Sequence, residues 1–431
     1  MARIAFCVLL LIACCNNVFG QAAKTPFSSF GIGEYYGSTT ANQQGMAGVG
    51  ISNPQYLFVN TQNPALLIFN GLGGITTFQA GILGEQRTIK DVNNKDKTKG
   101  GNLNYLLLAF PIKGGKWVTS VGLMPYSGMN YRFSYKEVLQ QEDTVSFLET
   151  GSGGLNQVTW SHGIAVNKKI SLGARASYLY STIENSFSNS VTLKNQIYQF
   201  SPDVNQRYYY RGFGFTAGVS VHLDSLFRNN PALKRKNYRF NFGAVYDFKA
   251  NLNTDYLQTL IRNNSAAQSV STDTLSTNAN GRTTLPSVTS VGASFGRANQ
   301  WMFAIDARYT DYTKFGFFEN QQTAAQKGWR VAAGLELTPN PSSLSSYLKV
   351  ITYRTGVSFE EYPYLVNGNP LRDFGTNFGL SLPVARGCSV DLSGRWGKRG
   401  SIDTNTIEEK YFKVYFGVTF NDRWFIKRRF D

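Results

Sequence analysis

Apolar and polar side chains alternate along most of the chain after residue 71. In residues 409–420 one face carries Phe412, Val414, Phe416, Val418 and Phe420, and the other carries Tyr411, Lys413, Tyr415, Gly417 and Thr419. Residues 300–314 repeat the pattern, with Trp301 and Phe303 on one face and Asp306 and Arg308 on the other. A period of two predicts β-strands, and here one face suits lipid and the other a polar lumen.

Turn residues divide this region into fourteen such segments. The predicted strands are 72–90, 102–112, 116–136, 153–167, 169–187, 207–224, 237–250, 285–297, 300–314, 328–338, 347–360, 373–384, 388–397 and 409–420. The links after even-numbered strands are mostly short, such as 113–116 and 384–387, whereas those after odd-numbered strands are long and polar, such as 188–206 and 251–284. This alternation is typical of outer-membrane barrels.

Composition supports a membrane barrel. Aromatic residues make up 14% of the chain and charged residues only 16%. Apolar runs after Gly20 are shorter than the roughly 20 residues that a membrane helix needs. We therefore predict an all-β protein, a 14-stranded antiparallel transmembrane β-barrel formed by residues 72–420, in the bacterial outer membrane.

The first twenty residues are predicted to be a signal peptide. Arg3 supplies a positive charge, residues 4–15 are a short apolar run, and cleavage is expected before Gln21. Three of the four cysteines would leave with this peptide, so Cys388 alone would remain and neither a disulfide nor a cysteine metal site is expected. A lipoprotein reading of Cys14 or Cys15 lacks a convincing preceding box.

The stretch before the first strand has another character. Residues 40–69 are too rich in Gly and Asn for a long regular element and too apolar for a solvated tail. We predict that residues 21–71 form an N-terminal plug, or hatch, inside the lumen. Residues 421–431 are predicted to be a basic periplasmic tail. The formal charge of +16 suggests nucleic acid, but export favours outer-membrane lipid and lipopolysaccharide as partners.

Several short motifs together resemble the FadL/TodX family of outer-membrane channels for long-chain fatty acids and other hydrophobic compounds. They are Asn63-Pro64-Ala65 before the first strand, the run from Lys116 to Ser127, the run from Tyr353 to Tyr364, and the ending from Glu409, which looks like the Bacteroidetes-type branch. The resemblance implies an inward kink in the third strand that opens the wall sideways. The chain departs from the family by continuing past Phe420.

The resemblance assigns roles to particular residues. Met124, Pro125, Tyr126, Ser127 and Gly128 would form the lateral-gate kink, because proline cannot donate to a strand ladder; alternatively Pro125 starts an external loop. Asn63, Pro64 and Ala65 would anchor the plug, and Leu66, Leu67, Ile68 and Phe69 would line a pocket or simply fill the lumen. Arg175 and Arg308 are candidates for binding a ligand head group, unless they join an internal ion-pair network with residues such as Asp247.

Other function classes lack support in the sequence. His162 and His222 cannot be paired with a nucleophilic serine by spacing, and no metal-ligand spacing or nucleotide fingerprint is visible. We therefore expect no enzyme activity, cofactor, metal or nucleic-acid partner. The predicted function is uptake of hydrophobic small molecules such as long-chain fatty acids. The alternative is a barrel that scaffolds or shuttles cargo for a protein-secretion machine, because the same branch contains relatives that look like secretion partners.

Overall fold

The computed structural model describes residues 22–70, 74–138, 144–192, 201–223, 238–263, 269–316, 318 and 326–424. The predicted signal peptide and residues 425–431 of the predicted tail lie outside the described residues. Inside them, β-strands dominate. No helix of the described residues is long and apolar enough to cross a membrane.

The period-two pattern sets the strand faces as the sequence predicts. In β19 (Glu408–Asp422), Phe412, Val414 and Phe420 are exposed, whereas Tyr411 and Tyr415 are buried. Each pleat sends neighbouring side chains to opposite faces. The apolar face is therefore the outer one, and the polar face points into the ring.

Eighteen strands make up the wall. They are β2 (Thr76–Lys90), β3 (Lys95–Lys113), β4 (Trp117–Pro125), β5 (Ser127–Val138), β6 (Thr144–Gly153), β7 (Asn156–Ala165), β8 (Ile170–Thr192), β9 (Ser201–His222), β10 (Tyr238–Asp247), β11 (Ala250–Asn263), β12 (Ser269–Leu285), β13 (Val288–Arg297), β14 (Trp301–Asp311), β15 (Lys327–Leu337), β16 (Thr352–Val366), β17 (Asn369–Ala385), β18 (Cys388–Arg399) and β19. Four consecutive pairs, β4/β5, β6/β7, β10/β11 and β12/β13, are each one wall strand with an interruption. The wall therefore has fourteen strands, and the predicted number is confirmed.

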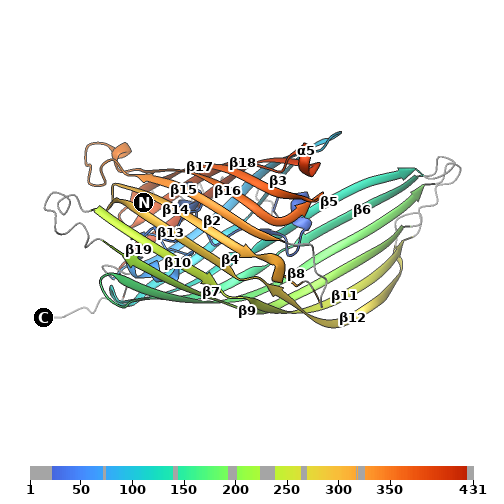
Figure 1. Ribbon diagram of the computed structural model, residues 1–431, viewed down its shortest axis with the longest axis horizontal. Helices are drawn as coiled ribbons and strands as arrows, with labels where there is room; N and C mark the ends of the chain where they lie inside the picture. The colour runs from blue at the N-terminus through green and yellow to red at the C-terminus, as the bar shows by residue number, and fades with distance from the viewer. Residues whose placement is uncertain are drawn as a thin grey trace.

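The ring closes between its first and last strands. β19 pairs antiparallel with β2 from Asp422↔Thr76 to Glu408↔Lys90. Near the short turns the circuit is complete, because β4 pairs with β7 and β10 pairs with β13. The barrel is tall in Figure 1, where β5, β6, β8, β11 and β12 extend beyond the rest of the wall.

Two sequence predictions are wrong at the end with the long connections. Residues 188–206 and 251–284 were expected to be loops, but β8 continues to Thr192, β9 starts at Ser201, and β11 and β12 form a paired hairpin. A strand that rises beyond the bilayer needs no apolar outer face, so the alternating pattern disappears although the pairing continues. The eleventh predicted strand is also displaced, since Tyr347–Lys349 form the short helix η6 and β16 begins at Thr352.

The N-terminal segment, residues 22–70, contains only short elements. They are η1 (Pro26–Ser29), β1 (Glu34–Tyr35), α2 (Ala41–Gly45), η2 (Pro64–Leu66) and α3 (Leu67–Asn70). The backbone N–H of Thr40 donates to the Gln43 side chain at 3.1 Å and closes the start of α2. Two other short helices, η5 (Tyr312–Lys314) and α5 (Ile402–Asn405), lie in connections.

Buried apolar side chains gather in two main places. Aromatic and aliphatic residues of the taller half, including Tyr131, Leu155 and Tyr208, pack around Ile32 of the N-terminal segment. A second cluster surrounds Ala41, Val59 and Leu67 and includes Tyr105 and Tyr415 of the wall. Both clusters join the N-terminal segment to strands, so this segment contributes to the core of the barrel.

Candidate functional site

The N-terminal segment touches strands on several sides of the ring. α2 contacts β16, β17, β18 and β19, whereas η2 contacts β7, β8 and β9, and α3 contacts β3, β4 and β7. Figure 1 draws this blue segment among the strands. Its partners belong to the buried polar face of the wall, such as Ser393, whose hydroxyl donates to the Ala41 carbonyl at 2.6 Å.

Asn63, Pro64 and Ala65 lie directly against the wall. The Asn63 side chain donates to the carbonyls of Ile51 at 2.7 Å and Val219 at 3.1 Å, and its oxygen accepts from the Ala65 N–H. The part of the wall that contacts these three residues has no side chains, because Gly163, Gly173 and Gly218 form one row across β7, β8 and β9. A Cβ on Gly173 would lie 2.2 Å from the Ala65 nitrogen. The close contact therefore requires glycine in this row.

Charged wall residues hold the middle of the segment. Asp306 of β14 accepts from the backbone N–H groups of Gly50 at 2.7 Å and Ile51 at 3.0 Å. Arg330 of β15 donates to the Ala47 carbonyl at 2.5 Å. These bonds satisfy backbone groups of a segment that has little regular structure of its own.

The third wall strand is interrupted at the predicted kink. β4 ends at Pro125, and the N–H groups of Tyr126 and Ser127 both donate to the Leu155 carbonyl, at 2.7 and 3.1 Å. The next wall strand breaks at the same level, where Gly153 and Gly154 have φ of +118° and +138°. Only glycine adopts such angles without strain. Pro125 therefore does not start an external loop, because the strand resumes as β5 at Ser127.

The interruption leaves a seam in the wall. On one edge β3 pairs with β2 through residues 95–109, and on the other edge it pairs with β4 only from Leu106 onward. β5 pairs instead with β6 and with β1. Across the described residues no register joins β3 to β5, so residues 95–105 of β3 have no partner strand on that side. On its facing edge, among the described residues, β5 pairs only with β1, at Ser127 and Gly128.

Residues 22–36, here called the seam segment, occupy this gap. On one side Thr25 N–H donates to the Asn130 carbonyl at 2.8 Å, and β1 pairs with β5 at Glu34↔Gly128. On the other side the Thr98 hydroxyl of β3 donates to the Lys24 carbonyl at 2.9 Å. The N-terminal segment thus supplies the hydrogen bonds that the two strands do not give each other.

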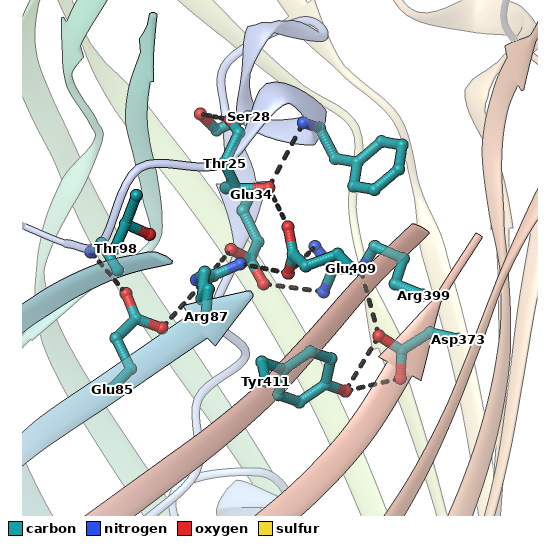
Figure 2. A network of polar contacts seen from close by, with 12 residues as sticks. Thr25, Ser28, Glu34, Glu85, Arg87, Thr98, Asp373, Arg399, Glu409 and Tyr411 are labelled. Atoms are coloured by element: carbon teal, nitrogen blue, oxygen red, sulfur yellow. Dashed lines mark hydrogen bonds and ion pairs between the residues drawn. The ribbon is translucent and has the colours of Figure 1, made fainter. Parts of the chain in front are cut away.

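Glu34 ties the seam segment to a buried ion-pair network (Figure 2). Its carboxylate lies 2.6 Å from Arg87, 2.8 Å from Arg399 and 3.2 Å from Lys413. Figure 2 shows Glu34 between Arg87 of β2 and Arg399 of β18. Its side chain is 5% exposed and that of Arg87 is fully buried. One acidic residue of the segment therefore meets three cations of the wall.

The rest of the network balances its charge. Arg87 also pairs with Glu85 at 2.7 Å and Glu409 at 2.8 Å. Asp373 accepts from Arg399, Arg395 and Tyr411. Four cations (Arg87, Arg395, Arg399 and Lys413) thus face four carboxylates (Glu34, Glu85, Asp373 and Glu409). Buried charges are tolerated only when they are paired in this way.

The pKa of Glu34 follows from these neighbours. Burial raises the pKa, but the charges of Arg399, Arg87 and Lys413 outweigh burial and hold the pKa well below its usual value. Glu34 is therefore ionised at neutral pH and holds the segment by charge.

Two cavities lie against β1. The interior cavity, about 60 Å³, is lined by residues that include Tyr35, Tyr126, Arg308 and Tyr312. The wall cavity, about 370 Å³, is lined by Tyr36, Pro125, Gly128 and Gly154 among others. Tyr35 lines the interior cavity and Tyr36 the wall cavity, and both also line a third cavity of about 50 Å³.

The two arginines predicted to meet a head group have different surroundings. Arg175 donates to the Thr61 carbonyl at 2.6 Å and pairs with Asp247 at 3.2 Å, so its side chain already has partners. The guanidinium of Arg308 faces the Tyr35 ring at 5.4 Å in the interior cavity. In the described part of the chain, no carboxylate forms an ion pair with Arg308. Glu360 and Glu361 line the same cavity as Arg308.

The predicted pocket-lining residues pack tightly. Leu66 and Leu67 are fully buried, Ile68 is 8% exposed, and Phe69 packs between the rings of Tyr56 and His222. Neither the interior cavity nor the wall cavity is lined by them. Their observed packing is that of residues that fill space.

Sequence reasoning missed Glu34, Arg87 and the Gly153-Gly154 pair. Glu34 could have been singled out from the sequence, because it is the only acidic residue between positions 22 and 70. The glycine pair inside a strand pattern also indicates a bend. The partners of Glu34 could not be read from the sequence, because Arg399 lies 365 positions away.

His222 has partners that spacing did not reveal. Its ring lies 3.3 Å from the Ser171 hydroxyl and 3.0 Å from the Asn241 side chain. Ser171 is fully buried, so a substrate has no access to this serine. Within the described residues there is no group of three or more His, Cys, Asp or Glu side chains that could hold a metal ion.

The closed ring, its interrupted third strand and the buried N-terminal segment define a class of protein. The fold is that of the fourteen-stranded FadL-type barrels. The P. putida toluene transporter TodX is similar, with a TM-score of 0.58 and 14% identity over 91% of this chain and 99% of that chain. A Pseudomonas aeruginosa FadL homologue has a TM-score of 0.55 and 12% identity over 91% of this chain and 100% of that chain. The monoaromatic hydrocarbon channel CymD has a TM-score of 0.53 and 15% identity over 90% of this chain and 98% of that chain.

The chain itself belongs to the BamG family, whose model matches residues 1–431. No curated protein matches the sequence. Because the solved structures share little sequence identity with this chain, they support the FadL/TodX resemblance only at the level of the fold. The Bacteroidetes-type branch stays a prediction.

Proposed function

We propose that this protein is an outer-membrane channel for hydrophobic small molecules, which leave the barrel sideways through the seam between β3 and β5. The observation that carries the proposal is the interrupted third wall strand with β1 in the gap. A ring of continuous strands has no lateral exit. At this seam, short hydrogen-bonded contacts with a separate segment replace strand pairing.

The membrane location rests on the outer face of the wall. Large apolar side chains such as Phe303, Val331 and Val414 are exposed on several strands, as a lipid-facing band requires. Export by residues 1–20 belongs to the same proposal. Outer-membrane lipid and lipopolysaccharide are then the surrounding partners.

We assign residues 21–71 to a plug, residues 72–420 to the barrel and residues 421–431 to a periplasmic tail. The contacts of α2 and η2 with different sides of the ring support a plug within the lumen. Asn63, Pro64 and Ala65 anchor its end to β7, β8 and β9. Leu66, Leu67, Ile68 and Phe69 fill space around that anchor.

Opening requires movement of the seam segment. The interior cavity of about 60 Å³ holds about two waters, far less than a long-chain fatty acid. Displacing β1 would join this cavity to the wall cavity of about 370 Å³, between Tyr126 and Gly128. A ligand carboxylate in the interior cavity would meet Arg308, and the aromatic side chains Tyr126 and Tyr312 would surround an apolar tail.

One observation favours the alternative, a barrel that scaffolds or shuttles cargo for a protein-secretion machine. The seam segment is held by a balanced, buried ion-pair network, and opening breaks bonds to three wall cations at once. A barrel that never opens would use its outer surfaces, of which the long hairpins in Figure 1 are the most prominent.

A reversible disulfide across the seam tests the channel. Tyr35 and Ser127 are register partners, so Tyr35→Cys with Ser127→Cys, in a Cys388→Ser background, would lock β1 to β5. We expect uptake of radiolabelled oleate by a host lacking its own fatty-acid channel to be lost on oxidation and restored by a reductant. Each single cysteine variant is the control.

Normal oleate uptake by the fully oxidised double variant would reject the lateral route. If deletion of the gene leaves oleate uptake unchanged but stops protein secretion, the scaffold function is correct and the channel is not.

A further inference from the structure

A larger cavity lies at the end of the barrel with the short turns. It measures about 680 Å³ and is bounded by residues 53–58 of the N-terminal segment and by the ends of β10 and β13–β18. It shares no lining residue with the interior cavity or the wall cavity. Its volume lies within the range of small-molecule sites.

One row of side chains crosses the wall of this cavity. The register places Arg239 of β10 beside Gly296, Gly296 beside Met302, Met302 beside Glu336, and Glu336 beside Arg354. Gly296, Met302 and Glu336 separate the two arginines by four strand spacings, roughly 19 Å. The two guanidinium groups therefore have separate surroundings.

Only one of these arginines has a carboxylate partner. Arg354 lies 2.7 Å from Glu336, so those two charges cancel. Arg239 packs over the Tyr56 ring with its guanidinium carbon 4.9 Å from the ring centre, and its buried Nε has no hydrogen-bond partner. No ion pair involves Arg239 within the described residues. A ring attracts a cation but leaves its charge uncompensated.

The opposite side of the cavity is apolar. Leu57 is 48% exposed, and Phe58 packs under Arg354 with the guanidinium carbon 5.6 Å from the ring centre. The loop is fixed in place, because the Leu57 carbonyl accepts from Asn421 at 3.2 Å and Tyr56 packs against Phe69. An uncompensated cation thus faces a preformed apolar surface.

We propose that this cavity binds an amphiphile with one negatively charged head group, which pairs with Arg239 while its apolar tail lies on Tyr56, Leu57 and Phe58. A guanidinium binds carboxylate and phosphate by the same paired hydrogen bonds. The shared chemistry therefore fits a free fatty acid or a lysophospholipid. The site is independent of the seam and of the proposed lateral route.

Photolabelling of the full-length protein in detergent tests the site. The probes are a diazirine-bearing palmitate and a diazirine-bearing lysophosphatidylglycerol, with the methyl ester of the palmitate probe as the neutral control. We expect mass spectrometry to find label on residues 53–58 with at least one anionic probe, and little with the ester. Whichever anionic probe labels at the lower concentration identifies the source.

Substitution of Arg239 completes the test. Arg239→Gln should lower labelling of residues 53–58 by about tenfold, the value of one charge-assisted hydrogen bond, and Arg239→Lys should restore part of it. Arg211→Gln is the matched control, since Arg211 pairs with Asp255 far from the cavity and is 62% exposed. Equal labelling of wild type and Arg239→Gln, or equal labelling by ester and acid, would overturn the proposal. The heat-dependent gel shift of a closed barrel verifies that each variant is folded.

Discussion

At the scale of single residues, Glu34 has the most consequential contacts. It is the one carboxylate that the N-terminal segment contributes, and it lies between Arg87, Arg399 and Lys413. Its neighbours Tyr35 and Tyr36 line the cavities beside β1. A change at Glu34 therefore affects the ion-pair network and the cavities beside β1 together.

Neutralising Glu34 should loosen the seam segment. Glu34→Gln leaves four buried cations with three carboxylates, and an uncompensated buried charge costs about 3–5 kcal/mol. We expect faster hydrogen exchange of the residue 22–36 amides while the wall amides stay protected. Asp273→Asn is the control, because Asp273 pairs with Arg262 where both side chains are about half exposed, and such a pair contributes little. Unchanged exchange in Glu34→Gln would show that the segment is held by other contacts.

Acid should have a related effect. The pKa of Glu34 is depressed because Arg399, Arg87 and Lys413 outweigh burial, so its ionised form stabilises the folded state. That stabilisation is complete above the ordinary glutamate pKa of 4.5 and is lost as pH falls below it, through the depressed pKa. Protease protection of residues 22–36 should decline over that acidic range. A Glu34→Gln variant should show a weaker decline, and an identical profile would contradict the assignment to Glu34.

The residue scale also sets the limit of sequence reasoning. Asn63 and Pro125 could be found from local chemistry, because a capping side chain and a missing N–H act on their immediate neighbours. The environments of Arg175 and Arg308 could not. Both are arginines on predicted strands. Arg175 is bound by Asp247 and the Thr61 carbonyl, whereas Arg308 faces the Tyr35 ring.

At the scale of elements, glycine rows let the irregular segment lie against regular strands. Gly163, Gly173 and Gly218 leave the inner surface of β7, β8 and β9 flat below residues 63–65. A residue with a Cβ in this row would push the segment away. The alternating pattern of apolar and polar residues did not predict this glycine row, because glycine fits either face of a strand.

A single methyl group should disturb this contact. The Cβ of Gly173→Ala would lie 2.2 Å from the Ala65 nitrogen, and overpacking of this kind costs about 1–3 kcal/mol. We expect a lower thermal midpoint and greater protease sensitivity of residues 22–70. Gly84→Ala is the matched control, because its Cβ would meet no atom within 4 Å. Equal stability of the two variants would mean that the segment does not rest on this row.

At the scale of the whole molecule, the strand number and closure followed from periodicity and the parity of the links. The height of the wall did not, because polar strands beyond the bilayer look like loops in a sequence. The seam could be predicted only in part. Pro125 marks where pairing stops, but the partners on either side, Thr98 and Asn130, depend on how β3 and β5 separate in space.

The ring closes between strands at opposite ends of the chain, where Thr77 and Asn421 are hydrogen-bonded across 344 positions. The N-terminal segment binds Asp306 of β14, Ser393 of β18 and the backbone of β9. These sites come together only when the strands are side by side. The N-terminal segment is synthesised before the strands but can dock completely only after the last strand has paired, so its complete docking indicates that barrel assembly has finished. A barrel whose strands are not all paired would be recognised by an N-terminal region that proteases can still cleave.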